Sequence, residues 1–263
     1  MGAELNRPTA EPNPRPGFRG HWWVGAMLAG LAVAILPFDH QISDPQNLAS
    51  LRGDVIRCVT LSEFFAHGYG VAIIAIGIWL LAPAKKTLIP RIVVCAIWPS
   101  LVVNLVKTLF GRFRPTTYFE KNSIARFPTD FSETWTGWLP GEKLNLLYDS
   151  QSLPSGHAAT AWGLAIGMTW AFPKGKWLFM GLAVMASVQR VTSFAHWPSD
   201  VLCGAAFGIV LAGSITKNWG IGYLIRRFEN RTAANASVAS ADKLLLPIGR
   251  DHRSQDEQSD KAA

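Results

Sequence analysis

The sequence has few charged residues and few cysteines, and each shortage excludes a class of protein. Lysine, arginine, aspartate and glutamate make up 16% of the 263 residues, whereas soluble domains carry about a quarter. Such a chain has too little polar sequence to cover a soluble core. The cysteines, Cys58, Cys95 and Cys203, are odd in number and lack the C-x-x-C spacing of metal sites. We therefore expect no disulfide framework and no zinc site.

Hydrophobic residues, in contrast, make up 49% of the chain and gather in six long runs. A membrane-spanning helix needs about 20 mostly apolar residues, and each run comes near that length. The alternative is a soluble all-α protein with buried core helices, which the shortage of polar sequence disfavours. The expected fold is therefore an all-α integral membrane bundle of six transmembrane helices. The expected spans are residues 21–38, 63–83, 91–110, 157–173, 177–195 and 199–217.

The segments outside the spans are expected to be tails and loops. Residues 1–20 and 228–263 are polar and low in complexity, which predicts disordered tails on both sides of a six-span domain at 21–220. Residues 50–62 have the pattern of a short amphipathic helix. The long loop 111–156 is dense in aromatic residues. It is expected either to lie on the bilayer surface and shape a lipid entrance, or to form a small local core.

The distribution of basic residues predicts the orientation in the membrane. Lysine and arginine gather in the N-terminal tail, the link 84–91, the turn 173–176 and the segment after the sixth span. Six spans would place these four segments on one side, and the positive-inside rule makes that side cytoplasmic. Anionic lipid headgroups explain the net charge of +7, so we expect no nucleic-acid partner. The opposite ends of the spans then face away from the cytoplasm.

Three short polar islands lie at those opposite ends. The first contains Lys107 and Arg114-Pro115. A separation of seven residues is about two helical turns, so both cations are expected on one face of the third span. Arg112 would face elsewhere and is a weaker candidate. The alternative reading is a basic cluster that snorkels at the membrane edge.

The second island is Pro154-Ser155-Gly156-His157. Ser155 is a plausible N-cap of the fourth span, and the free N–H groups of a helix start attract anions. Gly156 allows the backbone to approach a phosphate closely, and His157 would stand at the rim of the site. The alternative is an ordinary capped helix start with an interfacial histidine.

The third island contains Arg190, His196 and Asp200. Pro198 is expected to start the sixth helix, with His196 in the preceding turn and Asp200 in the first helical turn. A carboxylate that points back at the imidazole would fix its tautomer and leave the other ring nitrogen as a nucleophile. The guanidinium of Arg190 matches phosphate oxygens. A structural His–Asp contact is the alternative, but burying such groups at a membrane edge is costly, which favours a functional site.

Together the three islands resemble the tripartite signature of the type 2 phosphatidic acid phosphatase family, the membrane branch of the phosphatase and vanadium haloperoxidase superfamily. The resemblance covers about residues 60–215 and includes the six-span layout. One position departs from the family pattern: Gln189 stands where the family has a serine before the arginine.

The resemblance implies a mechanism without metal or cofactor, and the sequence has no carboxylate cluster suited to Mg²⁺ beside the islands. His196 would attack phosphorus to form a phosphohistidine, Asp200 would orient His196, and His157 would act as general acid and base. The implied phosphate-binding residues are Lys107, Arg114, Ser155, Gly156 and Arg190.

The implied function is that of a lipid phosphatase acting on the extracytoplasmic leaflet. We expect the chain to be a bacterial inner-membrane protein. Lipid A 1-phosphate and undecaprenyl diphosphate are the favoured substrates. Phosphatidylglycerophosphate, phosphatidic acid and transfer of the phosphate to another lipid remain alternatives. An alternative from another functional class is a catalytically idle membrane protein that binds lipid or is associated with transport.

Overall fold

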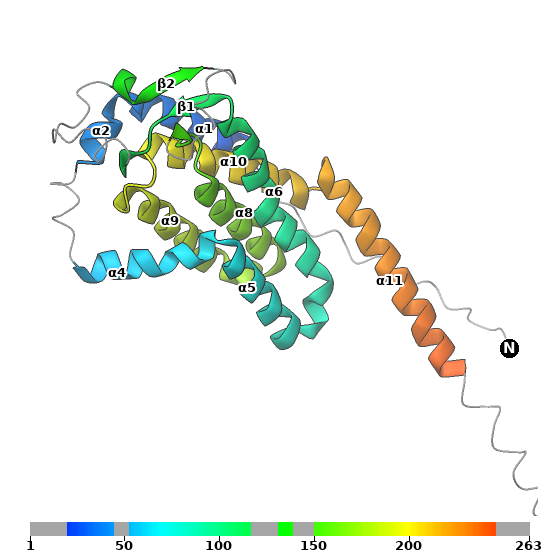
Figure 1. Cartoon of the computed structure of the whole chain (residues 1–263). Helices are drawn as coiled ribbons and strands as arrows, with labels where there is room; N and C mark the ends of the chain where they lie inside the picture. Colours follow the sequence, from blue (N-terminus) through cyan, green and yellow to red (C-terminus); the bar gives the residue numbers. More distant parts are fainter. Residues whose placement is uncertain (1–19, 45–52, 117–130, 139–149, 246–263) are drawn as a thin grey trace, which may run out of the picture.

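The computed structural model describes residues 20–44, 53–116, 131–138 and 150–245. These residues are mostly helical, with one small sheet (Figure 1). The elements are α1 (His21–Ile35), α2 (Asp39–Ile42), α4 (Gly53–Leu61), α5 (Gly68–Leu81), α6 (Ile89–Lys107), β1 (Phe110–Arg112), β2 (Trp135–Trp138), α8 (Gly156–Ala171), α9 (Lys176–Thr192), α10 (Pro198–Thr216) and α11 (Ile221–Leu245). Short 3₁₀ turns connect several of them, and α4 is the short helix expected within 50–62.

Three described stretches are long and apolar enough to cross a membrane, namely His21–Ile42, Pro83–Lys107 and Pro198–Thr232. The bent pair Gly53–Ala66 and Gly68–Leu81 adds a fourth if it is counted as one span. Helices α8 and α9 have 16 and 17 residues, which is shorter than the roughly 20 of a typical span. The membrane character is therefore supported, and the number of six spans stays a prediction.

Helix α8 lies at the centre of the bundle, where it packs against α6, α9 and α10 (Figure 1). Small residues let these helices approach closely. An added Cβ at Gly163 of α8 would lie 2.1 Å from the carbonyl oxygen of Cys95 on α6. An added Cβ at Gly208 of α10 would lie 2.7 Å from the carbonyl oxygen of Ala159 on α8. This close packing brings the end of α6 and the starts of α8 and α10 near one another.

The second expected span, 63–83, is a broken helix. Its first residues end the stretch Gly53–Ala66, and most of the rest is the helix Gly68–Leu81, which differs from that stretch in direction by 75°. The extended backbone of His67 (φ −99°, ψ 148°) separates the two stretches. An added Cβ at Gly70 would lie 1.9 Å from the carbonyl oxygen of Phe64, so the bend requires glycine at that position. The prediction of one continuous helix is therefore wrong here.

A two-stranded antiparallel sheet departs from the expected all-α fold. Phe110 of β1 pairs with Trp138 of β2, and Gly111 pairs with Gly137. The sheet lies at the end of the bundle near α1 and α2 (Figure 1). The chain therefore leaves the axis of α6 as an extended strand instead of continuing as a helix.

Helix α11 extends away from the bundle (Figure 1) over residues where the sequence predicts disorder. After Gly222 it contains five alanines and neither glycine nor proline, which gives it a higher helix propensity than its polarity implies. The prediction of a disordered tail is wrong for residues 228–245. Residues 246–263 and the N-terminal tail lie outside the described residues.

The first half of α11 is fixed to the bundle by one arginine. Arg91 on α6 donates two hydrogen bonds to the carboxylate of Glu229, with N–O distances of 3.1 and 2.7 Å. A third, of 2.6 Å, goes to Oδ1 of Asn218. Such bidentate pairs combine charge with fixed geometry, so the start of α11 belongs to the folded domain.

Candidate active site

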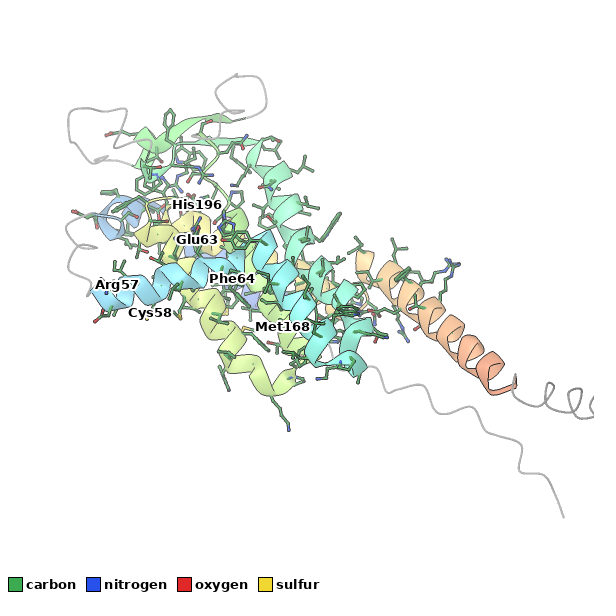
Figure 2. All side chains as sticks on the ribbon, turned by 60° about the horizontal axis from the view of Figure 1, so that its bottom comes forward. Arg57, Cys58, Glu63, Phe64, Met168 and His196 are labelled. Carbon is green, nitrogen blue, oxygen red and sulfur yellow. The ribbon has the colours of Figure 1, made fainter. Side chains whose placement is uncertain are left out.

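The three polar islands come together at one end of the bundle. They occupy the end of α6, the start of α8 and the turn between α9 and α10. A backbone hydrogen bond joins the second island to the third, because Ser155 N–H donates to the Asp200 carbonyl at 2.9 Å. Figure 2 labels His196 and Glu63 toward this end of the bundle and Met168 further along it.

The first island is not one helix face. Helix α6 ends at Lys107, and Arg114 follows β1, so the prediction that both lie on one helix is wrong. The two cations nevertheless line the same cavity of about 400 Å³, together with Gly156 and His157. Both side chains are almost fully buried. The chain therefore gathers two cations and a histidine around one hollow large enough for a phosphate group.

Ser155 caps helix α8, as the sequence predicts. Its backbone is extended, and its Oγ accepts a hydrogen bond from Ala158 N–H at 3.4 Å. Gly156 is the first helical residue, so free N–H groups of the first turn lie beside the cavity. This is the local arrangement that favours an anion.

His196 lies in the turn before α10, and Pro198 is the first residue of that helix, as predicted. The imidazole Nδ1 lies 2.9 Å from the Ser152 carbonyl oxygen. Because a carbonyl only accepts, Nδ1 carries the proton and Nε2 keeps its lone pair. Nε2 lies 3.4 Å from Nη1 of Arg114. The reactive nitrogen of His196 is thus directed to the guanidinium that lines the cavity.

Asp200 lies in the first turn of α10, but it does not contact the imidazole by a hydrogen bond. Its Oδ2 is 3.9 Å from Nδ1 of His196. The same oxygen accepts from Ser152 Oγ at 2.5 Å and from Trp197 N–H at 3.0 Å. Asp200 therefore fixes Ser152, whose carbonyl holds His196, and its orienting effect in this structure passes through Ser152.

Arg112 faces away from the cavity, as expected, and is fully buried. Its Nη1 donates to Oδ1 of Asp200 at 2.5 Å, and its Nη2 donates to Oδ2 of Asp39 at 2.7 Å. Ser199 completes this group, because its Oγ accepts from Arg112 and donates to Asp39. We call these four residues the Arg112 cluster. It ties the segment after α6 to α2 and to the start of α10.

Arg190 is held by a carboxylate that sequence reasoning missed. Its Nη2 forms an ion pair with Glu63, and its Nε donates to Oε1 of Gln189 at 2.5 Å. Gln189 in turn donates to Oε2 of Glu63 at 3.0 Å. The glutamine that departs from the family pattern thus supports the arginine through Glu63. An ionisable residue at the edge of an expected span is a signal that could have identified Glu63.

The environment of His196 favours its neutral form. Burial lowers the pKa of His196 well below its usual value, and the positive charges of Arg114 and Lys107 lower the pKa further. The imidazole is therefore neutral at pH 7, and its Nε2 is available as a nucleophile.

Glu63, His67 and His157 place three possible metal-ligand atoms within 4.8 Å of one another. The Glu63 carboxylate already pairs with Arg190 and lies 3.1 Å from Nε2 of His67. The adjacent guanidinium disfavours a second cation at the same carboxylate. The rings of His67 and His157 meet edge to face, with centroids 4.6 Å apart. Glu63 and His67 fit a support for Arg190 and His157 better than the three residues fit a metal site.

Residues 88–220 of the chain match the PAP2 superfamily. This range is just over half of the 263 residues and includes all three polar islands. No solved structure matches the chain.

Curated relatives match shorter parts. The lipid A 1-phosphatases of Rhizobium johnstonii and Rhizobium etli are each 28% identical over 112 residues, which cover 43% of this chain. That match spans 40% and 42% of the two relatives. The lipid A 1-phosphatase of Porphyromonas gingivalis is 38% identical over 66 residues, which cover 24% of this chain and 15% of the relative.

Proposed function

Because the chain belongs to the PAP2 superfamily, we propose that it hydrolyses a phosphate ester or diphosphate of a membrane lipid through a phosphohistidine. The observation that carries the proposal is the geometry of His196. Its Nδ1 is held by a carbonyl, and its Nε2 lies beside Arg114, which lines the cavity with Lys107 and His157. The names of the relatives favour lipid A 1-phosphate as the substrate, with undecaprenyl diphosphate as the second choice.

In the first step, Nε2 of His196 attacks phosphorus and forms a P–N bond as the P–O bond to the lipid breaks. His157 gives a proton to the leaving oxygen. Lys107, Arg114 and Arg190, with the N–H groups at the start of α8, stabilise the charge on the phosphoryl oxygens.

In the second step, His157 removes a proton from water, and the oxygen attacks phosphorus. The P–N bond breaks, inorganic phosphate leaves, and His196 returns to its neutral form. Asp200 positions His196 through Ser152 in both steps. The proposed cycle assigns each proton and charge to a side chain of the protein or to the N–H groups at the start of α8, so it calls for no metal ion.

The proposed topology has six spans, both termini in the cytoplasm and the site at the periplasmic end, in a bacterial inner membrane. The position of the basic link 84–91 supports it. Nζ of Lys85 donates to the carbonyl of Ala171, the last residue of α8, at 3.1 Å. The basic link therefore lies at the end of α8 opposite Gly156, as the positive-inside rule requires.

Phosphate release in the presence of a chelator tests the proposed function. The purified protein in detergent, with excess EDTA, should release phosphate from at least one of lipid A, undecaprenyl diphosphate, phosphatidylglycerophosphate and phosphatidic acid. The rate with EDTA should stay within about twofold of the rate without it, because no step uses a metal. Loss of all release in EDTA, restored by a divalent cation, would overturn the metal-free mechanism. Absence of release under every condition would favour a protein that binds lipid without hydrolysing it.

The support that Glu63 gives Arg190 leads to a second prediction. Glu63→Gln keeps the size of the side chain but removes the charge that fixes the guanidinium, so we expect kcat to fall about tenfold. Asp54→Asn is the matched control, because Asp54 is an exposed carboxylate whose ion-pair partner is the exposed Arg57. The control should keep its full rate. Equal rates for the two variants would show that Glu63 does not position Arg190.

A further inference from the structure

The cavity has a polar wall that the proposed mechanism does not use. Ser100 and Asn104 of α6 and Thr160 of α8 line it together with Lys107 and His157. Positions 100, 104 and 107 lie on one face of α6, since they are separated by four and three residues. The phosphate-binding lysine thus stands at the end of a polar row that continues into the bundle.

The two polar side chains on α6 point into the site. An added Cβ at Gly156 would lie 3.4 Å from both Oδ1 of Asn104 and Oγ of Ser100. Both oxygens therefore approach the start of α8, next to His157. Within the part of the chain that the structure describes, neither side chain has a hydrogen-bonding partner. Asn104 is exposed and Ser100 is half-buried, so both are accessible to a ligand, and polar side chains of this kind in an apolar span mark the path of a polar ligand.

The lining of the cavity changes with depth. At about 1.5 Å per residue, Asn104 lies about 4.5 Å below Lys107 along α6, and Ser100 lies about 10 Å below it. The apolar Ile97 and Leu101 line the same cavity and are exposed. Below Lys107, the cavity-lining residues of α6 run Asn104, Leu101, Ser100 and Ile97, so hydrogen-bonding and apolar side chains alternate. A ligand that matches this lining has hydroxyl or amide groups and hydrocarbon close together beside its phosphate.

We propose that Ser100, Asn104 and Thr160 form a subsite for a hydroxyl- or amide-bearing headgroup, such as an acylated hexosamine, joined directly to the scissile phosphate. This inference rests on the proposed phosphatase function and narrows its substrate class. A polyprenyl diphosphate has its inner phosphate at this place, which accepts hydrogen bonds but has no hydroxyl or amide hydrogen to donate to Oδ1 of Asn104. Sites that hydrogen-bond a substrate group discriminate strongly against analogues that lack it.

The test compares the headgroup with the phosphate alone. Asn104→Leu and Ser100→Ala should each lower kcat/KM for lipid A about fivefold, and the double variant about 25-fold, as expected for losing neutral hydrogen bonds. The inhibition constant of inorganic phosphate, which has no headgroup, should stay within about twofold. Both substitutions make the span more apolar, so membrane insertion is retained. Leu105→Ala is the control, because Leu105 is exposed and does not line the cavity.

Each of the other outcomes would overturn either the subsite or the phosphatase function. Equal weakening of lipid A hydrolysis and of phosphate inhibition would place the two residues in the phosphate site and overturn the subsite. Unchanged kcat/KM for lipid A in the double variant would also overturn it. Wild-type release from undecaprenyl diphosphate but not from lipid A would overturn the subsite and leave the phosphatase function intact. No release from any lipid phosphate would instead overturn the phosphatase function itself.

Discussion

His196→Ala is expected to lower phosphate release by about 10³-fold or more, because the variant has no atom to form the P–N bond. The remaining cations and helix N–H groups would still bind phosphate, so inhibition by inorganic phosphate should persist. The measurement is phosphate release from the preferred lipid, beside the melting temperature of the variant in the same detergent. Full activity in His196→Ala would overturn the proposed nucleophile.

A matched variant separates chemistry from folding at this buried position. His196→Asn keeps a side-chain N–H near Nδ1, which is able to donate to the Ser152 carbonyl that now holds the imidazole at 2.9 Å. It should keep the melting temperature of the wild type and still lack activity. The wild type, quenched at alkaline pH during turnover, should carry phosphate on His196 by mass spectrometry. A fully active Asn variant would contradict the assignment as clearly as an active Ala variant.

Local signals in the sequence predicted the residues whose positions depend on their immediate neighbours. The N-cap at Ser155, the helix start at Pro198 and the turn that holds His196 are all found where they were expected. Each follows from a short-range rule: a serine before a helix, a proline in its first turn, a polar stretch between two apolar runs. The broad membrane character follows in the same way from the lengths of the apolar runs.

Contacts between distant parts of the chain were not predictable by such rules. Glu63 and Arg190 are 127 residues apart, and Arg112 lies 73 residues from Asp39. The helix period placed Lys107 and Arg114 on one face, but pairing of β1 with β2 takes the chain off that helix. The pairing depends on β2, a segment more than 20 residues further along the chain. The helical periodicity of the residues around Lys107 contains no information about that segment. The same limit explains why Ser152, and not Asp200, is the direct partner of the imidazole.

The Arg112 cluster carries the prediction with the largest effect on stability. Arg112→Met should lower the free energy of unfolding by about 3–5 kcal/mol, because it leaves the carboxylates of Asp39 and Asp200 buried without their counter-charge. Arg57→Met is the control, since the Arg57–Asp54 pair is exposed, spans 3.8 Å and is worth about 0–1 kcal/mol. Denaturant or thermal unfolding in detergent measures both. Equal stabilities of the two variants would contradict the structural role of the cluster.

A second substitution shows whether uncompensated charge is the cause. Arg112→Met with Asp39→Asn removes one cation and one anion, so part of the lost stability should return. Activity should follow a different pattern. Asp200 would still lack its guanidinium partner. It would therefore fix Ser152 less firmly, and the Ser152 carbonyl would in turn position His196 less firmly. Recovery of stability without full recovery of kcat would therefore separate the two roles of Arg112, as a support of the fold and as the anchor of the residue that positions the nucleophile. Recovery of both together would mean that Arg112 supports only the fold.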